Sequence, residues 1–135
     1  MSVGLLIITH EQIGSVLIET ATTMLAACPL EVEVVPVFFD SDPDEILKQA
    51  NKKVGLLDKG DGVLVLTDMY GSTPSNVATK LLAEHERLAL VAGINLPMLV
   101  RLLNYPDSTL QQLVDKALTG GRDGVLRCAS DSGIK

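Results

Sequence analysis

The chain has 135 residues, of which 47% are hydrophobic and 21% charged, and its formal net charge is -6. This composition predicts a globular domain and argues against a disordered chain. An acidic chain without clustered Lys and Arg is a poor partner for nucleic acid, because phosphate contacts need positive charge. No apolar run approaches the roughly 20 residues that span a bilayer, and the N-terminus resembles no signal peptide, so we expect a cytoplasmic protein.

Apolar segments in chain order predict the strands. VGLLIIT (3–9) and GVLVLTD (62–68) are continuous apolar runs, which are typical of strands buried on both faces, and LALVAGI (88–94) is a further strand. EVEVVPVFF (31–39) is rich in β-branched residues. Because Pro36 within it cannot donate a ladder hydrogen bond, this strand is expected at an edge of the sheet.

Helical patterns separate these strands. The predicted helices span residues 13–27, a segment from Asp42-Pro43-Asp44-Glu45 to about Leu57, a segment from Pro74 to about Glu84, a short helix after Pro97, and a last helix from about Ser108 to Thr119. Gly120-Gly121 is expected to end the last helix. A short segment over 124–128 follows it, and the tail 129–135 is expected to be disordered.

The alternation of strands and helices predicts an α/β fold with a doubly wound, mostly parallel sheet in the order 2-1-3-4. In that order the chain turns to opposite faces after the first and third strands, and ligands bind beyond the carboxyl ends of those strands. His10 ends the first strand and Asp68 ends the third. The fold alone therefore brings this histidine and this carboxylate together.

A histidine that faces a carboxylate has a specific chemical use. A carboxylate that accepts a hydrogen bond from one ring nitrogen fixes the tautomer and leaves the other nitrogen as a nucleophile. Beside the pair stands Gly71-Ser72-Thr73-Pro74, with Thr73 expected as N-cap and Pro74 as the first helical residue, a terminus suited to binding an anion. A nucleophilic nitrogen, an orienting acid and an anion site together predict phosphoryl transfer to histidine.

Each of these signals also has a purely structural interpretation. A histidine at a strand end is most often a polar residue at the core's edge, and Gly-Ser-Thr-Pro is an ordinary helix start. His85 stands among charges and is expected on the solvated surface, and Cys28 and Cys128 have neither metal-type nor disulfide-type spacing. The sequence contains no Walker-type phosphate loop, GxGxxG, GxSxG or metal-ligand cluster, so neither a cofactor nor a metal is expected.

From Val3 to about Leu126 the sequence resembles the IIA component of the mannose-type phosphoenolpyruvate-dependent phosphotransferase system (PTS). The resemblance rests on four segments: the apolar strand ending in Thr9-His10, VLVLTD with its Gly-Ser-Thr-Pro-Ser-Asn continuation, AGINLPML (92–99) and GRDGV (121–125). It implies one EIIA domain over 1–128 that acts as a protein-histidine phosphotransferase. Such a domain accepts phosphate from phospho-HPr on His10 and passes it to a IIB component.

The resemblance also implies roles for particular residues. Asp68 would orient His10, and Gly71, Ser72 and Thr73 would contact the phosphate. Family members are homodimers in which a short C-terminal strand, here 124–128, pairs antiparallel with the partner's sheet. A membrane would be contacted only indirectly, through a transporter complex.

The sequence departs from the common family pattern in two respects. Ser72 stands where many relatives have glycine, with Thr73 before the proline, and we expect no IIB domain after the IIA domain. The acceptor is therefore expected to be a separate chain, and the protein serves either transport or regulation.

Two other functions stay open. One is the related phosphoryl-transfer subunit of dihydroxyacetone kinase, and the other is a non-catalytic module that binds a small anion or a partner protein in the same crevice. Phosphorylation on aspartate, as in receiver domains, is disfavoured because only Glu11 stands beside His10 at the end of the first strand.

Overall fold

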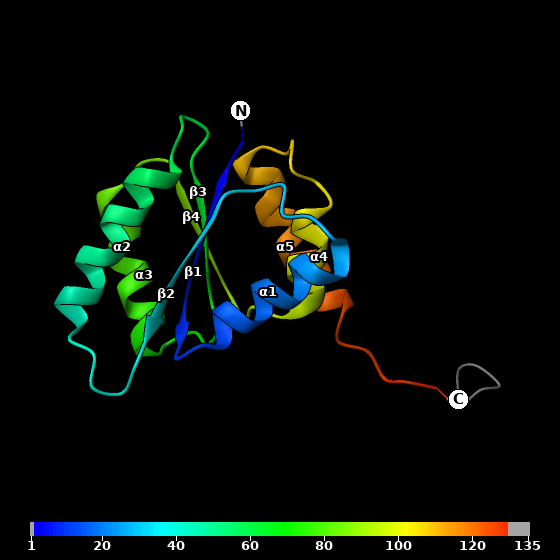
Figure 1. Ribbon diagram of the computed structural model, residues 1–135, viewed down its shortest axis with the longest axis horizontal. Helices are drawn as coiled ribbons and strands as arrows, with labels where there is room; N and C mark the ends of the chain where they lie inside the picture. The colour runs from blue at the N-terminus through cyan, green and yellow to red at the C-terminus, as the bar shows by residue number, and fades with distance from the viewer. Residues whose placement is uncertain (1, 130–135) are drawn as a thin grey trace.

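The structure is a computed structural model that describes residues 2–129. Its centre is a four-stranded parallel sheet in the order β2-β1-β3-β4, with helices on both faces (Figure 1). The strands are β1 (Gly4–His10), β2 (Val32–Val37), β3 (Val63–Thr67) and β4 (Leu88–Ala92). The helices are α1 (Ile13–Leu25), α2 (Pro43–Leu57), α3 (Thr73–Glu84), α4 (Leu96–Leu103) and α5 (Leu110–Asp123). The predicted fold class and strand order are confirmed.

The central and edge strands differ as their sequences predict. β1 and β3 are neighbours, with Ile8 opposite Thr67, and both strands are buried over almost their full length. β2 lies at an edge and contains Pro36. Lys53 of α2 covers part of that edge, because its Nζ donates to the Val34 carbonyl at 2.8 Å and lies 3.3 Å from Glu33 Oε1.

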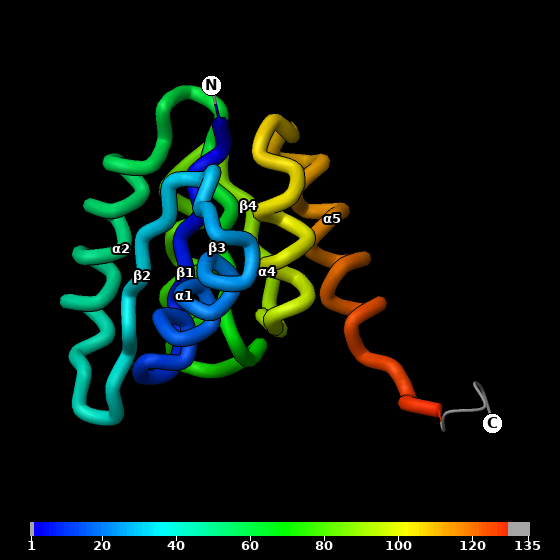
Figure 2. Tube along the Cα trace, turned by 45° about the vertical axis from the view of Figure 1, so that its right-hand side comes forward, coloured from blue at the N-terminus to red at the C-terminus, as the bar shows by residue number. Residues whose placement is uncertain are grey.

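Alternate residues of the sheet build two separate cores. The face covered by α1, α4 and α5 carries a cluster that includes Leu5, Ile7, Leu64, Leu66, Ile18, Leu99, Leu102 and Leu113. The face covered by α2 and α3 carries a cluster that includes Leu6, Ile8, Val63, Val65, Ile46, Val54, Val77 and Leu81. Figures 1 and 2 show these two helical layers on opposite sides of the sheet. Burial on both faces explains why the central strands are continuous apolar runs.

The prediction that Gly120-Gly121 ends the last helix is wrong. Helix α5 continues to Asp123, and both glycines are buried. A Cβ on Gly120 would lie 2.7 Å from Arg101 Cβ, and one on Gly121 would lie 2.9 Å from Met98 Cε. The glycines therefore allow α5 to pack closely on α4, which outweighs their cost in a helix interior of about 1 kcal/mol each.

Residues 125–129 have no regular secondary structure in the single chain, and Val125 and Leu126 are exposed. Figures 1 and 2 show this segment leaving the body of the protein after α5. Of the tail predicted to be disordered, residues 130–135 lie outside the described residues. None of the helices in residues 2–129 combines the length and the apolar character that crossing a membrane requires.

Candidate functional site

His10 and Asp68 meet at the carboxyl ends of the two central strands, as predicted. A single carboxylate oxygen, Asp68 Oδ2, accepts both the His10 backbone N–H at 3.0 Å and a hydrogen bond with ring Nδ1 at 2.8 Å. The other oxygen, Oδ1, accepts the Met69 backbone N–H at 3.0 Å. The His10 side chain is 43% exposed, while that of Asp68 is 14% exposed. The carboxylate is thus enclosed and fixed, and the ring projects toward solvent.

The pKa of Asp68 lies below its ordinary value. Burial of the carboxyl group pulls this pKa upward, but the hydrogen bonds from the His10 ring and the His10 backbone N–H outweigh burial. Asp68 is therefore ionised near neutral pH and can only accept hydrogen bonds. In the neutral ring of His10, the proton accordingly resides on Nδ1, and Nε2 keeps a free lone pair.

The turn after β3 differs in detail from its prediction. Ser72, not Thr73, is the N-cap of α3, and Pro74 is the second helical residue instead of the first. The Ser72 hydroxyl donates to the Met69 carbonyl at 2.6 Å, and the Gly71 N–H donates to Ser75 Oγ at 3.3 Å. Gly71 has φ +87, a conformation that suits glycine. Of the three predicted phosphate contacts, Ser72 and Gly71 thus use their donors within the turn.

Of the three residues predicted to contact phosphate, Thr73 fits that role best. It is the first residue of α3, where backbone N–H groups have no helical carbonyl to pair with and the helix dipole favours negative charge. Thr73 and His10 line one hollow of about 390 Å³, together with Val37, Phe38, Phe39, Ser41 and Pro43. The hollow can therefore present a small anion to the histidine and to a helix N-terminus at once.

Exposed apolar side chains lie in the loops after β2 and β3, and two of them, Phe38 and Phe39, line this hollow; the sequence alone did not single them out. Phe39 is fully exposed, Tyr70 is 82% exposed, and Met69 and Phe38 are exposed at 66% and 40%. We call these four residues the apolar rim. Phe38, Phe39 and Tyr70 are three of only four aromatic residues, since the chain has two Phe, two Tyr and no Trp. Their position at or just beyond the ends of two predicted strands is the feature of the sequence that could have indicated this apolar rim.

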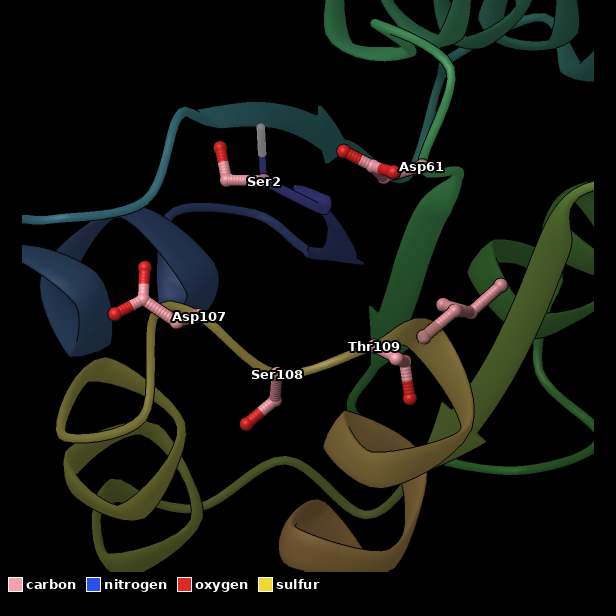
Figure 3. A pocket seen from close by; sticks show the side chains of 6 residues that line it. Ser2, Asp61, Asp107, Ser108 and Thr109 are labelled. Atoms are coloured by element: carbon pink, nitrogen blue, oxygen red, sulfur yellow. The ribbon is translucent and has the colours of Figure 1, made fainter.

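A second hollow lies at the opposite end of the sheet, beside the start of α5. Figure 3 shows Ser2 and Asp61 on one side of it and Asp107, Ser108 and Thr109 on the other. None of the predicted site residues lines this hollow. Within residues 2–129, no three His, Cys, Asp or Glu side chains are grouped closely enough to hold a metal ion.

The remaining residues considered from the sequence lie away from His10. His85, expected on the solvated surface, is half-buried there, with Nε2 2.8 Å from Asn51 Oδ1. Cys28 and Cys128 are exposed free thiols.

Comparison with known proteins gives a consistent result. Residues 4–118 match the family EIIA-man, described as "PTS system fructose IIA component". The chain is 33% identical over 131 residues to the PTS system mannose-specific EIIAB component of Escherichia coli, an alignment that covers 93% of this chain and 39% of that protein. The chain thus spans about two fifths of the length of this relative.

Solved structures agree at the level of the fold. The mannose/sorbose specific IIA subunit from Enterococcus faecalis superposes with a TM-score of 0.85 at 20% identity, covering 96% of each chain. A PTS IIA protein associated with the fucose utilization operon of Streptococcus pneumoniae gives a TM-score of 0.79 at 24% identity, covering 94% of this chain and 96% of the other. Because the family match extends across both central strands and the His10–Asp68 pair, this chain belongs to the mannose-type EIIA family of the phosphotransferase system.

Proposed function

We propose that this chain is a phosphoryl carrier that receives a phosphoryl group on His10 from phospho-HPr and passes it to a separate acceptor protein. Membership of the EIIA family gives a general phosphotransfer role in sugar PTS systems. The observation that carries the finer proposal is the bond from His10 Nδ1 to the enclosed Asp68, which leaves Nε2 free beside a hollow.

The chemical step follows from this geometry. The Nε2 lone pair attacks phosphorus, the bond between phosphorus and the donor's histidine nitrogen breaks, and its electron pair returns to the donor ring. Positive charge that develops on the His10 ring is stabilised by the Asp68 carboxylate at 2.8 Å. Backbone N–H groups in the first turn of α3 would offset charge on the phosphoryl oxygens. The new N–P bond is labile, which suits onward transfer.

The surroundings of His10 favour a protein donor over a small molecule. The apolar rim exposes large side chains from the loop after β2, where Phe38 and Phe39 line the hollow, and from the loop after β3. Exposed aromatic groups of this kind are enriched where proteins dock. The loop after β2 and the first turn of α2 also carry exposed acids, Asp40, Asp42, Asp44 and Glu45, which would attract a partner with a basic surface.

We also propose that the chain forms a homodimer in which residues 124–128 pair with a partner's sheet. β4 lies at an edge, and the segment after α5 exposes Val125 and Leu126 at 77% and 69%. Pairing with a free edge would satisfy the backbone of this segment and cover its apolar residues. The downstream acceptor is a IIB component in trans or a regulatory protein.

The decisive test is phosphorylation by phosphoenolpyruvate, enzyme I and HPr, run on the wild type and on His10→Ala. We expect acid-labile, alkali-stable label on the wild type only, at one group per chain. His85→Ala is the matched control, because it removes the only other histidine and should label as the wild type does. An unlabelled wild type, with donors shown to be active on another acceptor, would move the assignment to a binding module.

The labelled protein then identifies the acceptor. Loss of label to a mannose-type IIB protein supports a transport role, whereas loss only to the nucleotide-bearing subunit of a dihydroxyacetone kinase supports the other branch. Label that neither protein removes would favour a regulatory role.

A further inference from the structure

Thr9, the residue before His10, makes contacts that the proposed transfer does not explain. It is the second-to-last residue of β1, and it is fully buried, at 0% exposure. The hydroxyl oxygen accepts the Gly14 backbone N–H at 2.8 Å, and the hydroxyl donates toward the His10 carbonyl at 3.3 Å. One side chain thus contacts the chain both at the histidine and at the start of α1.

The Gly14 contact substitutes for an ordinary helix cap. Gln12 is the N-cap of α1, and its side chain makes no capping hydrogen bond. The Gly14 N–H is one of the first N–H groups of the helix, which have no helical carbonyl to pair with. Thr9 supplies the missing acceptor from five residues upstream. The hydroxyl therefore ties the end of β1 to the beginning of α1, and the turn that carries His10 lies between them.

Gly14 fits this contact because it has no side chain. A Cβ at this position would lie 2.6 Å from Ile7 Cγ2 and 3.1 Å from Thr9 Oγ1. The start of α1 could not approach β1 this closely with a larger residue. The close approach and the hydrogen bond support each other.

The turn itself requires such support. Glu11 has φ +47, which non-glycine residues rarely adopt, and Gln12 has φ -92 and ψ 11, in the sparsely populated bridge region. The Glu11 N–H donates to the Val37 carbonyl at 2.8 Å. With Asp68 holding the His10 N–H and Thr9 facing the His10 carbonyl, both peptide groups of the histidine are fixed.

We infer that Thr9 is a positioning residue for phosphoryl transfer, whose hydroxyl fixes the His10 backbone so that the ring keeps Nδ1 on Asp68 and Nε2 toward the hollow. This inference rests on the proposed function for its kinetic consequence only. Without the hydroxyl, the turn gains freedom and the ring spends less time in the reactive orientation. Donor docking, which uses the apolar rim, is unaffected.

The test compares Thr9→Val, which keeps shape and removes the hydroxyl, with Thr9→Ser, which keeps the hydroxyl. Thr67→Val is the matched control: Thr67 is equally buried at 0%, lies at the end of the adjacent strand, and its hydroxyl has no partner among residues 2–129. Rates of phosphoryl acceptance are measured per folded molecule at saturating and limiting phospho-HPr. NMR of ¹⁵N-labelled imidazole reports the Nδ1–H tautomer and its hydrogen bond.

For Thr9→Val we expect about a tenfold lower rate at saturating donor, an unchanged half-saturating donor concentration, and a shifted Nδ1 resonance. Thr9→Ser and Thr67→Val should behave as the wild type. Wild-type rates and resonances in Thr9→Val, an equal loss in Thr67→Val, or no rescue by serine would each overturn the inference. Thr9→Ala is measured in parallel. If Thr9→Val impairs folding, Thr9→Ala replaces it, with the same expected and contradicting results.

Failure of the proposed function is distinguishable from failure of this inference. If the wild type accepts no phosphoryl group, the proposed function fails, yet the imidazole resonances still report whether Thr9 fixes the ring. If the wild type is phosphorylated and Thr9→Val matches it, only the positioning role fails.

Discussion

The two ends of the sheet each hold an aspartate whose pKa lies below its ordinary value, but the two carboxylates are used differently. At the amino end, Asp58 Oδ1 accepts the Gly60 and Gly62 N–H groups at 2.8 and 3.1 Å, and Oδ2 accepts from Arg87 at 3.2 Å. The Gly60 hydrogen bond lowers its pKa most. At the carboxyl end, the lowered pKa of Asp68 comes from hydrogen bonds with His10 that outweigh burial.

The two carboxylates differ in whether their hydrogen-bond partners keep an atom that can react. The Gly60 and Gly62 N–H groups bonded to Asp58 have no further capacity, and Arg87 has only N–H donors and no lone pair that could attack phosphorus. This carboxylate therefore fastens the loop before β3 and activates no nucleophile. The partner of Asp68 is a ring with a second nitrogen and 43% side-chain exposure. A lowered carboxyl pKa therefore does not identify a functional site by itself. It does so where the carboxylate is hydrogen-bonded to an exposed nucleophile that keeps a second, unpaired nitrogen.

Exchange of each aspartate for asparagine separates the two uses, and the largest effect is expected at Asp68. Asp68→Asn removes the negative charge and can donate to Nδ1, which moves the ring proton to Nε2 and blocks the attacking lone pair. We expect phosphoryl acceptance to fall about a hundredfold or more, with the fold retained. Single-turnover labelling by phospho-HPr measures this rate. A wild-type rate in Asp68→Asn would remove the orienting role of the carboxylate.

Asp58→Asn is the reciprocal variant, and its effect should appear in stability. It weakens two backbone hydrogen bonds and an ion pair with Arg87, whose side chain is 56% exposed, so we expect a loss of about 1–2 kcal/mol in the free energy of unfolding. Urea denaturation measures that loss. The labelling rate per folded molecule should be unchanged, and a decrease like that of Asp68→Asn would mean that the two ends are not independent.

The sheet and the His10–Asp68 pair were predictable because they depend on the hydrophobic pattern of the strands and on the order of strands and helices. Buried central strands must be apolar throughout, and Pro36 disfavours an interior position for β2. Together with the alternation of strands and helices, these features determine the strand order. The order then places His10 and Asp68 at one edge, whatever the side chains do in detail.

Features that depend on close packing were not predictable. Gly120 and Gly121 signal a helix end locally, but their burial against α4 keeps α5 helical, and only the tertiary structure contains that information. Both Ser72 and Thr73 are good N-cap residues, so the sequence does not distinguish them. The Thr9–Gly14 contact joins two residues of unremarkable type, and no local pattern indicates it.

Acid should reduce stability at both ends of the sheet in the same pH range. The folded-state pKa values of Asp58 and Asp68 lie below the ordinary 3.8. A depressed pKa contributes stability above the unfolded value, and this contribution is lost as pH falls through the folded values. We therefore expect the free energy of unfolding to decline below about pH 4. Urea titrations across pH should show a shallower decline in Asp58→Asn, and an equal slope would exclude Asp58 as a contributor.

The smallest expected effect concerns backbone strain, which also differs between the two ends. Beside Asp58 the positive φ values belong to glycines, Gly60 at +113 and Gly62 at +90, whereas beside His10 a glutamate adopts φ +47. The left-handed conformation costs a non-glycine residue about 1–2 kcal/mol, and glycine's extra freedom in the unfolded chain offsets part of the gain from replacing it. We expect Glu11→Gly to raise the free energy of unfolding by about 0.5–1 kcal/mol.

Gly60→Ala is the matched control for this last comparison. A Cβ on Gly60 would meet nothing within 4 Å, so the substitution tests conformation without a clash, and it should destabilise by about 1 kcal/mol or more. If Gly60→Ala destabilises while Glu11→Gly changes nothing, the contacts around Glu11 already offset its strain. The Glu11 N–H bond to Val37 and the Thr9 hydroxyl that brackets the turn are the contacts available to do so. Strain beside His10 would then be balanced by the residues that hold the histidine in place.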